Sequence, residues 1–206
     1  MFRYCVLVVL FFCTPASATD IHISTAPADA TSTINVTIAA GLGDVVLACG
    51  TWNISGSLLL SSGSPQVRGE HAGCTTIHLT GNNFAAFTCA GNPNQISVRD
   101  LTITGGAPNF NGNSNGISDL GQSAVHLSDC PLATIDNVTA RNMSGTAFDC
   151  EQASSSFGTV SALRFSRLTV SNSYRGYWAR NFCEYSICSD LVGPTTCLDS
   201  PAPPAT

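Results

Sequence analysis

Two aspartates, Asp129 and Asp149, are the residues best suited to chemistry, because each ends a short apolar run and is followed by a cysteine. In a repeating fold they would stack one above the other, and repulsion between the two carboxylates would raise the pKa of one of them. His126 and Arg141 are close in the sequence and complete a set of four candidate catalytic residues able to donate and accept protons. The alternative, which we favour, is that both aspartates hydrogen-bond the backbone at turns.

The cysteines predict disulfides rather than a metal site. The chain contains 10 cysteines, and two of them, Cys5 and Cys13, lie in a predicted leader. The even number that remains is typical of a disulfide framework in a secreted chain. We predict a bond between Cys130 and Cys150 across neighbouring repeats, with a ladder of free thiols as the alternative. Zinc is the less favoured interpretation, because no Cys-x-x-Cys pair occurs. The other disulfide candidates lie near the C-terminus: Cys183, Cys188 and Cys197.

The first 18 residues are predicted to be a secretory signal peptide, with a basic Arg3, an apolar run over 5–12 and a small-residue cleavage site at Ala16-Ser-Ala18. The apolar run is too short to span a bilayer, so we expect a secreted or cell-surface protein without a membrane span. The chain has no lysine, and its 8 arginines face 13 acidic residues for a net charge of −5. This balance excludes nucleic acid as a partner, because phosphates need clustered cations.

Four Asn-x-Ser/Thr sequons are candidate glycosylation sites in a eukaryotic source. In a chain this rich in Asn, Ser and Thr, several sequons arise by chance. Their asparagines are Asn35, Asn53, Asn137 and Asn142.

Short runs rich in Val, Ile, Leu, Thr and Phe alternate with clusters of Gly, Asn, Ser and Pro, which is typical of strands and turns. No helical pattern is convincing after the leader. Three segments, 98–105, 135–142 and 165–172, align without gaps. Each has apolar residues at its first, fourth and sixth positions and threonine at its fifth. Self-similarity at this distance predicts one structural unit that repeats along the chain.

The repeat predicts an all-β parallel solenoid of about five coils, in which equivalent residues stack in columns. Asn142 and Asn172, which end two of the segments, are expected at corners with positive φ. Arg99 and Asp136 share a repeat position and could form an exposed ion pair across coils. An antiparallel sandwich is the alternative, but the pattern recurs at coil distance rather than hairpin distance. The fifth positions would form an outward ladder of Thr102, Thr139 and Thr169.

The segment Gly43-Asp-Val-Val-Leu-Ala-Cys-Gly-Thr-Trp52 resembles the opening coil of right-handed parallel β-helix proteins of the pectin-lyase-like superfamily. The segments 67–70 and 96–106 resemble later coils of the same proteins. The segments 122–126 and 145–148 resemble the repeats of polymorphic outer-membrane-type surface proteins. The resemblance implies a right-handed parallel β-helix, and it does not select one activity among lyases, polygalacturonases, epimerases and surface proteins.

Polysaccharide hydrolases of this superfamily carry Asn-Thr-Asp, Asp-Asp, Gly-His-Gly and Arg-Ile-Lys motifs, and none occurs in this sequence. We therefore expect a secreted, non-catalytic β-helix without a cofactor that contacts extracellular glycans or surface proteins. The alternative is a polysaccharide lyase, hydrolase or epimerase, for instance a truncated relative of a larger enzyme. A hydrolase needs two carboxyls about 5–9 Å apart. A lyase needs a base beside a bound uronate, for which calcium would be the cofactor.

We predict four segments along the chain: a signal peptide at 1–18, an N-terminal lead-in at 19–42, the β-helix at 43–180 and a cysteine-containing tail with a disordered end at 181–206. An aromatic and basic cluster comes just before the tail. Aromatic rings on a solenoid can stack on sugars, but we favour a role in closing the last coil over the core. The cluster consists of Tyr174, Arg175, Tyr177, Trp178 and Arg180.

Overall fold

The computed structural model describes residues 20–60, 65–71, 73–90, 95–106, 121–128, 130, 132–151, 163–180, 187–189 and 192. The predicted signal peptide, Asp129, Cys183 and Cys197 lie outside these residues. The described elements are one helix, α1 (Thr31–Ala40), and short strands. The strands are β1 (Ile21–Ile23), β2 (Val45–Leu47), β3 (Gly50–Ile54), β4 (Leu58–Leu59), β5 (Gln66–Gly69), β6 (Thr75–Leu79), β7 (Ala85–Ala90), β8 (Ile96–Thr104), β9 (Ser123–Ser128), β10 (Ala133–Arg141), β11 (Thr146–Glu151), β12 (Arg164–Ser166), β13 (Thr169–Ser171), β14 (Arg175–Arg180) and β15 (Ile187–Ser189).

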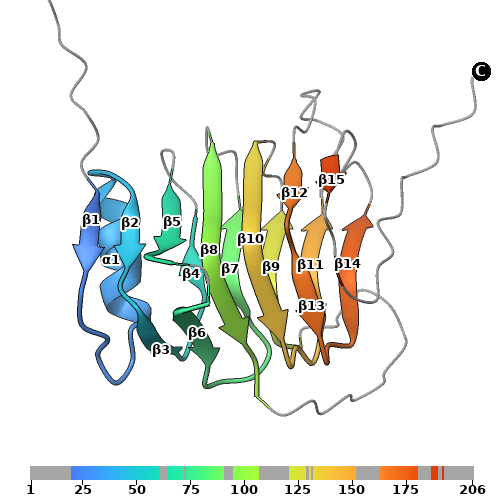
Figure 1. Cartoon of the computed structure of the whole chain (residues 1–206), viewed down its shortest axis with the longest axis horizontal. Coiled ribbons are helices and arrows are strands. Elements are labelled where there is room, and N and C mark those ends of the chain that lie inside the picture. Colours follow the sequence, from blue (N-terminus) through green and yellow to red (C-terminus); the bar gives the residue numbers. More distant parts are fainter. Residues whose placement is uncertain are drawn as a thin grey trace, which may run out of the picture.

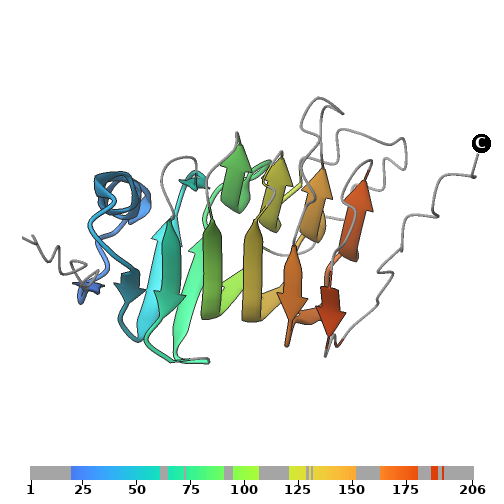
Figure 2. The same ribbon diagram turned by 90° about the horizontal axis from the view of Figure 1, so that it is seen from above.

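These strands form two parallel sheets that face each other across the core (Figures 1 and 2). Sheet A has the order β1-β2-β5-β8-β10-β12-β15; in addition, β13 pairs with β10, β6 with β8, and β3 with β6. Sheet B has the order β14-β11-β9-β7-β4. In Figure 1 the long strands of sheet A lie in front and run downward, those of sheet B run upward behind, and the chain advances from left to right. The described chain is therefore a right-handed parallel β-helix.

The predicted repeat is confirmed residue by residue. Val98 is paired with Ile135, and Ile135 with Phe165, so the first positions of the three segments stack. The threonines at the fifth positions stack in the same way, and Thr76 and Thr51 extend their column. Parallel register of this kind places identical residue types about 4.8 Å apart along the axis.

Single residues with positive φ make the sharp bends of each coil. Asn142 and Asn172 have φ of 57° and 48°, as predicted, and Asn172 Nδ2 donates to Asn142 Oδ1 at 2.7 Å. At the equivalent position of the preceding coil a side chain has no room, because a Cβ on Gly105 would lie 2.2 Å from the Asn142 carbonyl oxygen. A second bend, inside the long strands, was not predicted. It is formed by Asp100, Asn137 and Arg167, with φ of 58°, 53° and 52°.

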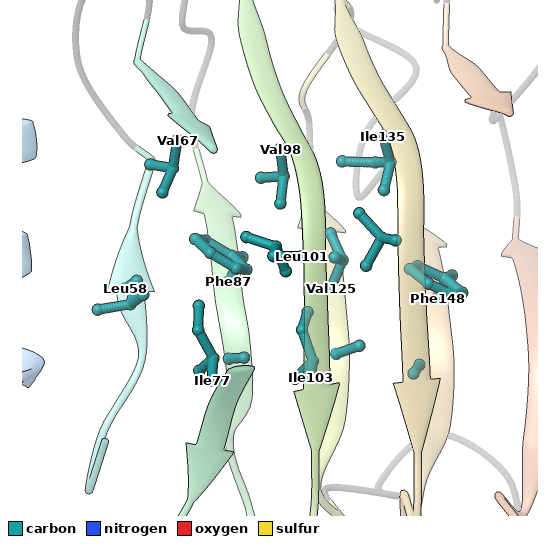
Figure 3. Close-up of a cluster of buried hydrophobic side chains, with 14 of the residues drawn as sticks. Leu58, Val67, Ile77, Phe87, Val98, Leu101, Ile103, Val125, Ile135 and Phe148 are labelled. Carbon is teal, nitrogen blue, oxygen red and sulfur yellow. The ribbon is translucent and has the colours of Figure 1, made fainter. Parts of the chain in front are cut away.

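The interior is filled by columns of apolar side chains from both sheets (Figure 3). Sheet B contributes Leu58, Phe87, Val125 and Phe148, which are in register and are at most 1% exposed. Each such side chain stabilises the fold by about 1.5–3 kcal/mol when it is removed from water. Sheet A faces them with Val67, Val98, Ile135, Ile77 and Ile103, all 0% exposed.

Helix α1 closes the N-terminal end of the coil, and the sequence analysis missed it. Its apolar residues face the core only through Ile34 and Ile38, which are 0% and 5% exposed. The other positions are mostly Thr, Ser, Asn and Ala, so no wide apolar stripe is present for a pattern search to find. Asp29 fixes the start of the helix, because its Oδ1 accepts hydrogen bonds from the Thr31 N–H at 3.0 Å and hydroxyl at 2.6 Å. Gly41, with φ of 62°, ends it.

Sheet A extends past both ends of the predicted β-helix segment at 43–180. β1 pairs with β2 at the N-terminal side, and β15 pairs with β12 at the C-terminal side. Both strands continue the same parallel register, so neighbouring chain segments cover the edges of the outermost coils.

The predicted bond between Cys130 and Cys150 is wrong. Cys130 is bonded to Cys89, with a Cα–Cα distance of 6.3 Å, and Cys150 is itself part of a disulfide. The two cysteines do not share a column, because Cys150 is in register with Leu127 and Cys130 lies three residues further along. A second bond joins Cys49 to Cys74, a pair that the sequence analysis did not propose. Cys188 lies in β15.

Candidate functional site

The outward face of sheet B carries a column in which Thr88, His126 and Asp149 of successive coils stack. Register runs from Leu59 to Thr88, then to His126 and then to Asp149. Strand alternation fixes this arrangement, because the neighbours Val125, Leu127 and Phe148 point inward and are at most 1% exposed. His126 on β9 and Asp149 on β11 are therefore held side by side on the outer surface.

The two side chains form a hydrogen-bonded pair. His126 Nδ1 lies 3.0 Å from Asp149 Oδ2. Asp149 is 8% exposed, whereas His126 is half-buried. A carboxylate that binds one ring nitrogen fixes the orientation of the imidazole, and it stabilises the ring when the ring takes up a proton. The second nitrogen, Nε2, is then the atom that can give a proton to a ligand or take one from it.

The structure rearranges the predicted candidate set. Asp149 is in register with His126 and hydrogen-bonds to it. The predicted partner Asp129 lies outside the described residues. Arg141 does not join the pair, because it ends β10 in sheet A and is paired there with Thr104 and Ser171. Sequence reasoning named both members of the pair, but it stacked the two Asp-Cys motifs and so misjudged the register.

Thr88 is the polar residue of this column on β7, and it is half-buried. In the sequence, Phe87-Thr88-Cys89 already resembles Phe148-Asp149-Cys150, because each has a polar residue one position before a cysteine. Thr88 was nevertheless not among the candidate site residues.

One ring of the aromatic cluster near the C-terminal end, that of Tyr177, belongs to the core. The Tyr177 ring stacks on Phe148 with centroids 5.3 Å apart, and Tyr177 is 5% exposed. Burial raises the pKa of the Tyr177 hydroxyl. Tyr174 instead lies beneath the Arg175 guanidinium, whose central carbon is 5.0 Å from the ring centroid. The favoured interpretation, in which aromatic rings close the last coil, is thus confirmed for Tyr177.

Three of the four sequon asparagines use their carboxamides inside the fold. Asn35 Nδ2 donates to the Ser57 carbonyl at 2.9 Å, and its Oδ1 accepts from the Leu59 N–H at 2.8 Å. Asn137 Nδ2 donates to Asp100 Oδ1 at 2.7 Å, and Asn142 accepts from the next coil as described above. Asn53 is the sequon asparagine without such a contact among the described residues. Glycosylation of any of the four stays a prediction.

The predicted ion pair between Arg99 and Asp136 is also wrong, although the two are neighbours in register. Asp136 is bonded to Arg167, and the Arg99 guanidinium lies 3.6 Å from both Asp44 and Asp100. Arg167, which has a positive φ of 52°, is the residue that pairs with Asp136 of the preceding coil.

Within the described ranges no group of three or more His, Cys, Asp or Glu could hold a metal ion. The His126–Asp149 pair offers too few oxygen ligands for calcium, which takes six to eight. No helix of the described part of the chain is long and apolar enough to cross a membrane.

Comparison with solved structures identifies the fold. The A-module of the mannuronan C-5 epimerase AlgE4 from Azotobacter vinelandii matches with a TM-score of 0.50 and 20% sequence identity, over 80% of this chain and 46% of the module. The chain has a parallel β-helix fold. ORF18 of Geobacillus virus E2 is also similar, with a TM-score of 0.43 and 12% identity over 79% of this chain and 38% of that one. The chain thus spans less than half the length of either structure. No protein-family model and no curated protein matches the sequence.

Proposed function

We propose that this protein is a secreted, non-catalytic β-helix that contacts extracellular glycans through the outward face of sheet B. The observation that carries the proposal is the hydrogen bond between His126 and Asp149 on that face. Strand register holds both side chains in place, so little side-chain freedom is lost when a sugar hydroxyl binds to them. The fold is shared with a module whose name gives mannuronan, a polysaccharide, as its substrate. The two described disulfides are compatible with an extracellular location.

The same pair supports a second candidate function, which is proton-transfer chemistry on a uronate polysaccharide. His126 Nε2 would remove the proton next to the uronate carboxylate, while Asp149 stabilises the imidazolium that forms. Return of a proton to the opposite face would be an epimerisation. Alternatively, the electron pair would form a carbon–carbon double bond as the glycosidic C–O bond breaks, and the released oxygen would take a proton. Hydrolysis with two carboxyls is a poorer match, because Asp149 faces a histidine.

One screen separates the two candidates. Protein that starts at Thr19 would be incubated with pectin, alginate, hyaluronan and neutral glycans, with calcium and with EDTA. Glycan binding would be measured by calorimetry, products by new ultraviolet absorbance of unsaturated uronides and by NMR of epimerised residues. Asp149→Asn would be compared with the wild type, with His126→Gln as a second variant because the half-exposed His126 is less coupled to folding.

We expect binding of at least one glycan, weakened roughly tenfold in either variant, because a hydrogen bond to a charged group is worth about 1.5–3 kcal/mol. Products that vanish in both variants would replace the binding proposal with the catalytic one. Binding and product formation that are both equal in the wild type and in the two folded variants would contradict both candidates.

A further inference from the structure

A second polar surface lies on the outward face of sheet A, away from the His126–Asp149 pair. Two adjacent columns of side chains run there along the axis of the coil, and we call them the ladder face. The first column is Thr51, Thr76, Thr102, Thr139 and Thr169. The second column is Asn53, His78, Thr104, Arg141 and Ser171.

The alternation of each strand turns both columns outward. The residues between them, Ile77, Ile103 and Ala140 among others, point into the core and are 0% exposed. His78 and Thr104 are half-exposed, and Arg141 is exposed. In Figures 1 and 2 the strands that carry the ladder face, β8 and β10, lie on the other side of the coil from β9 and β11. A ligand on one face would therefore leave the other accessible.

The ladder face has positive charge and no acidic residue in either column. Arg141 makes no ion pair among the described residues, whereas Arg68, Arg99 and Arg167 all do. His78 Nδ1 lies 3.0 Å from the Thr104 hydroxyl, which holds the ring and leaves Nε2 as its open nitrogen. Asp100, the acidic residue on β8 nearest these columns, already accepts a bond from Asn137 and lies 3.6 Å from Arg99.

The two nitrogen-bearing side chains are regularly spaced. His78 and Arg141 flank Thr104, one coil on each side, so their backbones lie two strand spacings apart, about 10 Å. The threonine column runs beside them; Thr51 is exposed and Thr102 is buried, and the other three are half-buried. A polymer with an acid group on each repeating unit presents carboxylates and hydroxyls in an equally regular series.

We propose that the ladder face binds an acidic glycan, with carboxylates at Arg141 and His78 and sugar hydroxyls against the threonine column. Arg141 would contribute most, because its guanidinium binds a carboxylate through two parallel hydrogen bonds. The inference rests on the proposed glycan contact for the class of ligand, and adds a surface and a charge requirement to it. The whole chain is acidic, with a net charge of −5, so it repels such a ligand except where this face attracts it.

The test is calorimetric titration of the mature protein with oligogalacturonate and oligomannuronate, and with neutral malto-oligosaccharides for comparison. Arg141→Gln removes the charge of an exposed residue and should leave the fold intact. Arg164→Gln is the matched control, because it removes the same charge from another exposed arginine of sheet A outside both columns. His78→Gln tests the second position, and circular dichroism checks that each variant is folded.

We expect Arg141→Gln to weaken uronate binding roughly tenfold, His78→Gln to weaken it less, and Arg164→Gln to leave it unchanged. Equal losses in Arg141→Gln and Arg164→Gln would show only a general effect of charge and would overturn the inference. So would tighter binding of the neutral chain, or uronate binding that is lost in His126→Gln but kept in Arg141→Gln. That last result would leave the sheet B proposal standing, and the two proposals can thus fail separately.

Discussion

At the scale of single residues, Asp136 and Arg167 form an ion pair at one bend of the coil. Arg167 donates to both carboxylate oxygens, and Ser166 donates to Oδ1 at 2.7 Å. The hydrogen bond from Arg167 lowers the pKa of Asp136 below its model-peptide value of 3.8, against the opposing effect of partial burial. A carboxyl with a lower pKa in the folded state stabilises the fold above its unfolded pKa, and this stabilisation is lost as the pH falls through the folded pKa.

Arg167→Gln should therefore destabilise the protein at pH 7 and have less effect at pH 2.5. The expected loss at pH 7 is small, about 1 kcal/mol or less, because the Arg167 side chain is 56% exposed and water screens the pair. Urea unfolding at the two pH values would measure it. Arg141→Gln is the control, because Arg141 is exposed without an ion pair in the described chain. A loss that is the same at both pH values would contradict the assignment.

Residue types predicted one kind of bend and missed the other. Asn142 and Asn172 were predicted at positive φ because asparagine tolerates that region and ends its segment each time. Arg167 has no such tolerance, and nothing in the sequence marks it as a bend. The bend at Arg167 can be recognised only because Arg167 occupies the same position of its coil as Asp100 and Asn137. The contact between His126 and Asp149 was not predicted for a related reason. A shift of a few residues in the register between coils changes which side chains are neighbours.

At the scale of elements, Asn35 closes the free edge of sheet B. β4 is the last strand of that sheet and pairs only with β7. On its open side the Asn35 carboxamide accepts from the Leu59 N–H and donates to the Ser57 carbonyl, as a neighbouring strand would. An edge that is satisfied in this way does not attract a strand of another chain.

Asn35→Ala should lower the free energy of unfolding by about 1–2 kcal/mol, because two backbone groups of an edge strand lose their partner. Urea denaturation would measure the change, with Asn53→Ala as the matched control from another sequon. A carboxamide that carries a glycan loses one N–H donor. Glycosylation at Asn35 should therefore also lower the free energy of unfolding. Identical stability of the two variants would rule out this role for Asn35.

Strands were predicted far better than the helix, and the reason is physical. A strand in this fold repeats with its coil, so each of Val98, Ile135 and Phe165 supports the assignment of the others. Helix α1 occurs once, and only Ile34 and Ile38 contact the core strongly enough to select its residue types. A terminal cap has no second copy in the chain with which it can be compared. With only two buried residues, the helix also lacks a periodic apolar pattern that would predict it.

At the scale of the whole molecule, the coil leaves two outward faces of different chemistry on a single rigid core. Sheet B presents the His126–Asp149 pair, and sheet A presents the ladder face with Arg141. Disulfides between Cys49 and Cys74, and between Cys89 and Cys130, join neighbouring coils. Such bonds reduce the freedom of the unfolded chain, and each typically stabilises a fold by about 2–4 kcal/mol. The faces are therefore held in a fixed relation, which suits contact with a long polymer.

The measurement that tests the central claim most directly is the affinity of His126→Ala for the glycan that the wild type binds. His22→Ala is the matched control, because His22 is an exposed histidine of β1 outside both faces. We predict that His126→Ala binds roughly tenfold more weakly and His22→Ala as tightly as the wild type, with all three equally folded. Unchanged affinity of His126→Ala would contradict the assignment of the glycan contact to sheet B.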